Sequence, residues 1–202
     1  MFAAKITSIA LMAILSNVAV AGQTSPVAVR QETHIDTSDW VPVKFQGKIL
    51  KYNPAALNTS VVVHNPPGSD GGDMSTTVIT NDCCGGSSFS GTASPWPTQG
   101  DCAVIRDWAY TLNSYWYIWT NTADYHGVVV YGTCVFGAGT RNVFDTYVGS
   151  SDMADLVRDG INRFANNGLV GAAGEMGCEN SCTQSFCGVS GRSSVFWKLQ
   201  RA

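Results

Sequence analysis

Charged side chains are scarce in this 202-residue sequence, because Asp, Glu, Lys and Arg together make up only 13% of it. An average soluble domain has about 25%. The 12 Lys and Arg residues are scattered among 15 Asp and Glu residues and form no basic run. Proteins bind nucleic acid chiefly through Lys and Arg that neutralise phosphates, so this composition argues against a nucleic-acid partner. It also argues against electrostatic adhesion to anionic lipid.

Motifs of the common enzyme classes are absent as well. The sequence has no Gly-x-Ser-x-Gly nucleophile elbow, no His-Glu-x-x-His zinc motif and no glycine-rich phosphate loop. Only one of the three histidines, His126, lies near the cysteines, and we expect it at the end of a strand rather than in the role of a base. We therefore predict a protein that is not an enzyme, with no catalytic residue and no cofactor. A secreted hydrolase that uses His126 or Glu175 is the alternative.

Long apolar runs are limited to residues 6–15, which is too short to span a membrane. The run follows Lys5 and precedes Ala19-Val20-Ala21, a cleavage signal of small residues. This pattern is typical of a secretory signal peptide. We interpret residues 1–21 as such a peptide and expect the mature chain to begin near Gly22. The prediction is a secreted, extracellular protein without a stable membrane anchor.

Cysteine is missing from the N-terminal part of the chain and occurs seven times after it, at Cys83, Cys84, Cys102, Cys134, Cys178, Cys182 and Cys187. In an oxidising compartment these residues are expected to form disulfides. Zinc is a competing interpretation, but the last three cysteines have no nearby His and fit no common zinc spacing, so we predict no metal. Because seven is an odd number, both a monomer and a disulfide-linked dimer remain open.

The N-terminal segment 22–80 differs in composition from the rest of the mature chain. It holds five of the seven Pro residues and a Gly- and Pro-rich stretch at 65–73. We interpret it as an arm and linker with two short strands, near 41–45 and 59–64. Asn58 begins an Asn-Thr-Ser glycosylation signal. Residues 81–202 then form a single cysteine-rich domain.

Two helices are expected in this domain. Apolar residues recur at helical spacing from Cys102 to Leu112, with Asp101 as the expected cap. A second apolar stripe runs from Met153 to Ala165 and ends before Asn167-Gly168. The acidic residues at its start suit the first turn of a helix, where the dipole favours negative charge.

The remaining patterns predict strands. Tyr115–Trp119 and His126–Phe136 are typical of two antiparallel strands, and 144–148, 170–176 and 195–199 of further ones. The fold class is therefore α+β, with two helices packed on an antiparallel sheet and disulfides as staples. On the first of these strands Tyr115, Tyr117 and Trp119 would share one face, and Trp116 and Ile118 the other. One face must fill the core, so an aromatic strip that binds sugar is the alternative to a core role.

Six short motifs occur in order between residues 83 and 178. They are Cys83-Cys84-Gly85-Gly86-Ser87-Ser88-Phe89, Ser94-Pro95, Asp101-Cys102, Tyr131-Gly132-Thr133-Cys134-Val135-Phe136-Gly137, Val148-Gly149-Ser150-Ser151-Asp152 and Gly171-Ala172-Ala173-Gly174-Glu175-Met176-Gly177-Cys178. This order resembles the fungal extracellular-protein-two effectors, a family also described as necrosis-inducing factors. The family is distantly similar to fungal-virus killer toxins with an α/β sandwich.

The resemblance implies a secreted fungal effector that perturbs host plant cells and brings no catalytic residues. Within it we expect Cys102 to pair with Cys134, and Cys178 to pair with Cys83 or Cys84. Cys182, Cys187 and the remaining vicinal thiol then compete for one more bond. We predict action by binding an unknown host protein or cell-surface target. An antimicrobial toxin and a cell-wall carbohydrate binder that uses Tyr115, Tyr117 and Trp119 are the alternatives.

Overall fold

The computed structural model describes residues 35–56, 81–181 and 191–202. The chain divides into two units, Met1–Thr33 and His34–Ala202. All described residues lie in the second unit, where they form two helices, α1 (Gln99–Ala109) and α2 (Ser150–Phe164), and ten strands. The strands are β1 (Val41–Phe45), β2 (Lys48–Tyr52), β3 (Cys84–Ser87), β4 (Ser90–Gly91), β5 (Tyr115–Ile118), β6 (His126–Tyr131), β7 (Cys134–Gly139), β8 (Thr146–Gly149), β9 (Ala172–Glu179) and β10 (Arg192–Arg201).

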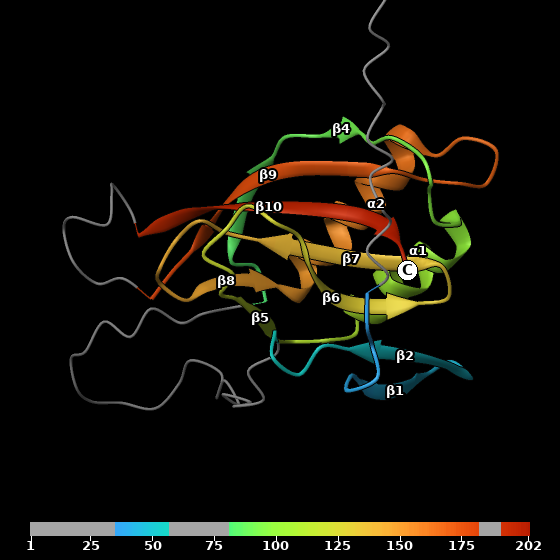
Figure 1. The fold of residues 1–202 in the computed structure, drawn as a ribbon, viewed down its shortest axis with the longest axis horizontal. Coiled ribbons are helices and arrows are strands. Elements are labelled where there is room, and N and C mark those ends of the chain that lie inside the picture. Colours follow the sequence, from blue (N-terminus) through green and yellow to red (C-terminus); the bar gives the residue numbers. More distant parts are fainter. Residues whose placement is uncertain (1–34, 57–80, 182–190) are drawn as a thin grey trace, which may run out of the picture. The chain divides into compact units, whose positions relative to one another are not determined.

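Eight of these strands form one antiparallel sheet in the order β1-β2-β6-β7-β10-β9-β3, with β4 also paired to β9 (Figure 1). The last strand in sequence, β10, lies in the middle of the sheet between β7 and β9. The two remaining strands, β5 and β8, pair with each other in a separate small sheet. The α+β class predicted from the sequence is confirmed.

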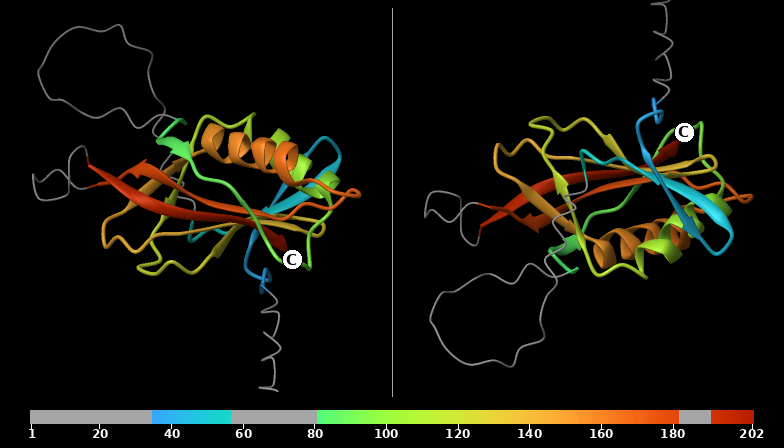
Figure 2. Two further views of the ribbon diagram at one scale, coloured as in Figure 1. Left: turned by 90° about the horizontal axis from the view of Figure 1, so that it is seen from above. Right: turned by 90° about the horizontal axis from the view of Figure 1, so that it is seen from below.

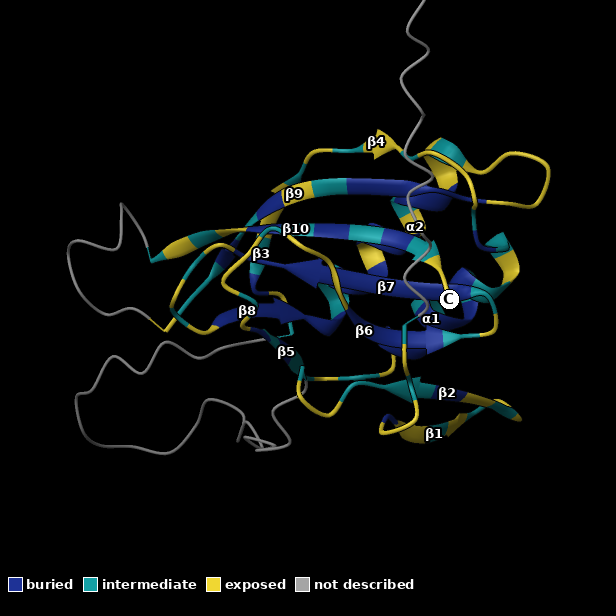
Figure 3. Cartoon of the chain, in the orientation of Figure 1, coloured by how far each residue is buried: buried dark blue, intermediate teal, exposed yellow. Residues whose placement is uncertain are grey.

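Both helices lie on the same face of the large sheet (Figure 2). The core between the helices and the sheet is continuous, and the buried positions in Figure 3 follow it through β6, β7, β9 and β10. Its largest fully buried side chains are Trp116, Trp197, Phe136, Leu50, Ile105 and Met153. Since apolar burial is the main favourable contribution to folding, this layer stabilises the whole arrangement.

The strand prediction for Tyr115–Trp119 and His126–Phe136 was wrong in its pairing. Residues 126–136 form not one strand but most of a hairpin, β6 and β7, which turns at Gly132. Gly132 has a φ of +53°, a conformation that glycine adopts at little cost. The strand β5 instead pairs with β8, the third predicted strand.

The expected cap of the first helix was also wrong. Thr98, not Asp101, is the N-cap, and its Oγ1 accepts the Asp101 N–H at 3.2 Å. The Asp101 carboxylate instead accepts the backbone N–H of Thr133 at 2.8 Å and the Thr133 hydroxyl at 2.7 Å. Burial raises the pKa of Asp101, but these hydrogen bonds outweigh it and hold the pKa below its ordinary value. Asp101 therefore fastens α1 to the β6–β7 turn.

The second helix follows the prediction closely. It is capped by Gly149 and ends before Asn167 and Gly168, which have φ values of 50° and 77°. Gly160 packs against the sheet, where a Cβ would lie 3.1 Å from the Ala172 Cβ. Asp152 lies in the first turn, as expected for an acid near the positive end of the helix dipole.

Part of the predicted N-terminal arm belongs to the sheet. The strands β1 and β2 form a hairpin, and Lys51 and Tyr52 of β2 pair with Val130 and Val129 of β6. On the opposite face from the helices, Trp40 packs with Val130 and Val135. The predicted strand near 59–64, Asn58, and the proposed signal peptide lie outside the described residues.

Candidate functional site

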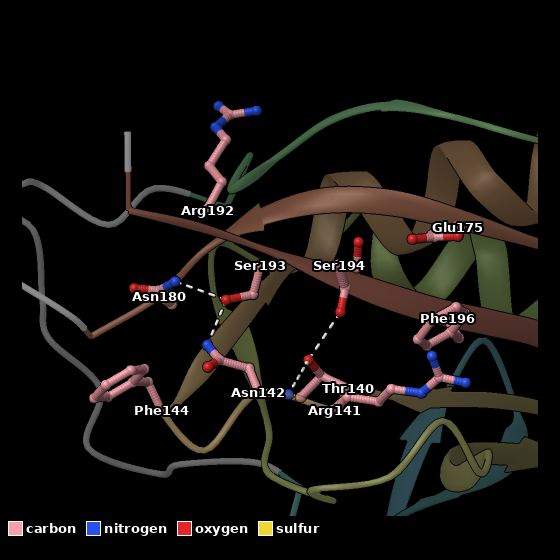
Figure 4. Close-up of a pocket in the computed structure, with 10 residues that line it drawn as sticks. All are labelled: Thr140, Arg141, Asn142, Phe144, Glu175, Asn180, Arg192, Ser193, Ser194 and Phe196. Carbon is pink, nitrogen blue, oxygen red and sulfur yellow. Dashed lines mark hydrogen bonds between the residues drawn. The ribbon is translucent and has the colours of Figure 1, made fainter. Parts of the chain in front are cut away.

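An open pocket of about 490 Å³ lies where β9, β10 and the segment between β7 and β8 meet (Figure 4). It is lined by Thr140, Arg141, Asn142, Phe144, Glu175, Asn180, Arg192, Ser193, Ser194 and Phe196. Its volume falls in the roughly 300–1,000 Å³ range typical of ligand sites. The pocket is the candidate functional site of the described residues.

Strand alternation places Arg192, Ser194, Phe196 and Glu175 on the face of the sheet away from the helices, whereas Ser193 shares the side of Val195 and Trp197. Along β10, Val195 and Trp197 are fully buried in the core, so the intervening Phe196 points to the other face. Phe196 pairs in register with Glu175 of β9 and with Gly139 of β7. The packing of the core therefore determines which side chains of β9 and β10 the pocket receives.

A network of neutral polar side chains orders one wall of the pocket. Ser193 Oγ accepts hydrogen bonds from Asn142 Nδ2 and, at 2.6 Å, from Asn180 Nδ2. A hydroxyl has two acceptor lone pairs and one donor hydrogen. Both lone pairs are used here, which leaves the Ser193 hydrogen available to a ligand. Thr140 Oγ1 donates to the Ser194 carbonyl at 2.8 Å and holds the adjoining segment against β10.

Three charged side chains line the pocket, two arginines and one glutamate. The Arg141 guanidinium lies over the Phe196 ring, with its Cζ 5.4 Å from the ring centroid. Arg192 Nη1 donates to the Gly177 carbonyl at 3.5 Å. Among the described residues, no carboxylate lies within ion-pair distance of either arginine, and the ion pairs are made elsewhere. The pocket thus offers two guanidinium groups and one carboxylate to a ligand.

The predicted aromatic strip is divided by the structure. Trp116 and Ile118 fill the core, and Tyr115 and Tyr117 lie on the other face of β5. These two tyrosines contact Tyr147 edge to face, with ring centroids 5.1–5.5 Å apart. Burial, followed by the hydrogen bond with Tyr117, raises the pKa of Tyr115 to about 12.

The third member of the strip, Trp119, follows β5 and is 67% exposed. None of the three predicted strip residues lines the pocket. The half-buried tyrosines pack edge to face on one another, which differs from the flat, open platform that stacks on a sugar ring.

Neither disulfide lines the pocket, although Cys178 pairs in register with the lining residue Ser193. The structure joins Cys102 to Cys134 and Cys84 to Cys178. Cys83 belongs to neither bond and is buried, and this burial raises the pKa of its thiol to about 12. A thiol with such a pKa is a weak nucleophile at neutral pH. Cys182 and Cys187 lie outside the described residues.

Asp152 anchors the segment that contains the vicinal cysteines. Its Oδ2 accepts the backbone N–H groups of Cys83, Cys84 and Gly149 at 2.8–3.0 Å. Burial raises the pKa of Asp152 to about 7, and the carboxylate of Asp82 adds to the rise, while the backbone N–H groups lower it. This carboxylate serves the structure of the domain, since it lies at the start of α2 and holds β3 in place.

The two residues considered for hydrolysis, His126 and Glu175, do not lie in the same site. Glu175 lines the pocket, whereas His126 lies at the exposed start of β6 and is not a lining residue. The prediction of His126 as a strand-end residue is confirmed. Within residues 35–56, 81–181 and 191–202, no group of three or more His, Cys, Asp or Glu side chains could hold a metal ion. The described helices also include none with the length and apolar character of a membrane span.

Sequence reasoning missed most of the pocket residues, including Arg141, Asn142, Asn180 and Ser193. These residues form no motif, and their proximity depends on the pairing of β10 with β7 and β9. The one available signal was the expected strand 195–199, whose outward positions face away from the core.

A comparison with models of protein families finds a match for the central part of the chain. A protein-family model named Hce2, described as "Pathogen effector; putative necrosis-inducing factor", matches residues 83–178. No curated protein matches the chain. The matched segment begins at Cys83, next to Cys84, and ends at Cys178, so it includes both cysteines of the Cys84–Cys178 disulfide. It also contains both helices. Residues 83–178, nearly half of the chain, therefore match the Hce2 family of pathogen effectors.

Proposed function

We propose that this pathogen effector is secreted by a fungus and perturbs host plant cells by binding a target at the pocket, rather than by catalysis. The observation that carries the proposal is the chemistry of the pocket. Its lining consists of amide, hydroxyl, guanidinium and aromatic groups around a single carboxylate. Such groups recognise a ligand by hydrogen bonds and stacking, while acid–base or nucleophilic chemistry needs a matched pair of groups.

Secretion is supported by three features. Residues 1–21 have the pattern of a signal peptide. The structure contains two disulfides, which form and persist in oxidising compartments. The family consists of pathogen effectors. Together they favour a protein that acts outside the cell that makes it.

The effector role is tested by infiltrating purified mature protein into leaves of several plant species. The oxidised protein is compared with a sample that has been reduced and alkylated. We expect tissue damage or a defence response from the oxidised sample alone, because the folded domain is what a target would recognise. Equal responses to both samples, or none in any species, would count against the proposal. Growth inhibition of fungi by the same preparation would instead indicate an antimicrobial role.

Binding is separated from catalysis by a set of variants. Arg141→Gln removes a pocket charge, and we expect it to weaken the leaf response. Arg163→Gln is the matched control, because Arg163 also lies over an aromatic ring, Phe89, at 4.1 Å, but does not line the pocket. His126→Gln should leave the response unchanged. Loss of the response in His126→Gln, with the fold intact, would favour the hydrolase alternative.

A further inference from the structure

We infer that the pocket binds an acidic sugar, an oligosaccharide that carries uronate carboxylates. The inference rests on the function proposed above for the same site and names the chemical class of its ligand. It depends on three features of the described residues, namely the charges, the neutral hydrogen-bonding groups and the strand positions around the pocket. Each feature restricts the ligand in a different way.

The charges favour a ligand with an anionic group. Two guanidinium groups and one carboxylate line the pocket, which leaves an excess of positive charge. The Phe196 ring supports the Arg141 guanidinium from one side, at 5.4 Å. The planar guanidinium fork matches a carboxylate with two parallel hydrogen bonds. Among the described residues this fork has no carboxylate partner, so a ligand can supply one without breaking an ion pair.

The neutral groups favour a ligand that is rich in hydroxyl groups. Ser193 accepts from Asn142 and Asn180, so its own hydrogen can donate outward. The Glu175 carboxylate is exposed and can only accept when ionised. A sugar hydroxyl both donates and accepts, so different rings of an oligosaccharide along the pocket can satisfy a donor such as Ser193 and an acceptor such as Glu175. A ligand that carried only anionic groups would leave Glu175 facing like charge.

The strand positions argue against an extended peptide as the ligand. Peptides commonly bind by adding a strand to an open sheet edge, where unpaired backbone groups are available. The strands that line this pocket, β9 and β10, are both internal, because β10 lies between β7 and β9, and β9 lies between β10 and β3. Their backbone groups already pair within the sheet. The pocket therefore recognises its ligand through side chains, as sugar-binding sites do.

The test is calorimetric titration of intact mature protein with a trimer of galacturonic acid. The methyl ester of the same trimer is the uncharged control, and a trimer of glutamic acid is the control for acidic peptides. We expect saturable binding of the acidic trimer and much weaker binding of both controls. Arg141→Gln should raise the Kd for the acidic trimer about tenfold, as for a lost hydrogen bond to a charged group. Arg163→Gln should leave the Kd unchanged.

A further variant tests the sign of the charge effect. Glu175→Gln removes the only negative charge of the pocket lining, so it should lower the Kd for the acidic trimer and leave weak binding of the ester unaltered. If Glu175 served only the folding of the domain, its substitution would change the Kd values of the acidic trimer and of the ester alike. Circular dichroism and thermal melting of each variant show that the fold is intact.

The outcomes separate this inference from the proposed function. The inference of an acidic sugar as ligand would be overturned by any of three results. These are equal binding of the galacturonic acid trimer and its ester, equal binding of the glutamic acid trimer, and no saturable binding of the galacturonic acid trimer. A protein that fails to bind the trimer but still provokes a leaf response remains an effector with a different ligand. If the protein binds the trimer but provokes no response in any plant, the sugar-binding site is supported and the proposed role in host damage is contradicted.

Discussion

The Cys102–Cys134 disulfide provides a quantitative test of what holds the domain together. It joins α1 to the first residue of β7, and both cysteines are fully buried. The bond spans a sequence separation of 32. Chain-entropy arithmetic for a loop of this length gives a contribution of about 3.7 kcal/mol to the free energy of unfolding. This is a large share of the roughly 5–15 kcal/mol of an ordinary domain.

The perturbation is the double variant Cys102→Ala plus Cys134→Ala, which removes the cross-link without leaving a lone thiol at either position. Urea unfolding, followed by Trp fluorescence, should show a loss of about 3.7 kcal/mol. The melting temperature should fall by roughly 7–15 °C. The m-value should rise, because an unfolded chain without the cross-link exposes more surface. Mass spectrometry of the non-reduced variant checks that the remaining cysteines have not changed partners.

The other disulfide is the matched comparison. Cys84–Cys178 has a sequence separation of 94, and the same arithmetic gives about 4.7 kcal/mol. The double variant Cys84→Ala plus Cys178→Ala should therefore be the less stable of the two. A loss below about 1 kcal/mol for the shorter loop, or the reverse order of the two variants, would refute the entropic reasoning.

Three further predictions concern single residues. Thr98→Ala removes the N-cap of α1 and should lower the free energy of unfolding by about 1 kcal/mol in urea titrations. Folded Asp152, whose pKa is raised to about 7, keeps a proton that the unfolded chain releases above about pH 4. Its contribution to stability should therefore fall as pH rises through this window, and Asp152→Asn should flatten that fall; an unchanged pH profile would contradict this. Gly174→Ala would drive a Cβ into the Ser88 carbonyl and should cost about 2 kcal/mol or more, whereas Gly86→Ala, which meets nothing within 4 Å, should change the melting temperature little.

The parts of the fold that local patterns determine could be predicted from the sequence. The apolar stripe of α2 has helical spacing, and Asn167-Gly168 ends the segment in the left-handed conformation. Strand β5 could be predicted because its residues, Tyr115–Ile118, are aromatic or β-branched and favour strands. These signals lie within a few residues of one another, so no knowledge of distant contacts was needed.

The parts that depend on distant contacts could not be predicted in the same way. The run 126–136 is nearly continuous in apolar residues, which hides the turn at Gly132 within it. The partner of β5 is β8, and nothing in either sequence specifies that pairing. Asp101 has the residue type of a cap, but its tertiary contact with Thr133 took precedence, while Thr98 served as the cap.

The pocket shows why function was harder to locate than fold. Its lining side chains become neighbours only after β10 enters the middle of the sheet, because Phe196 then lies beside both Glu175 and Gly139. The fully buried Trp197 forces Phe196 to the outer face, since adjacent strand residues point to opposite sides. A slip of β10 by one residue would bury Phe196 and expose Trp197, so the core enforces the register that the pocket needs. The packing that stabilises this effector domain therefore also positions the residues through which it would recognise a ligand.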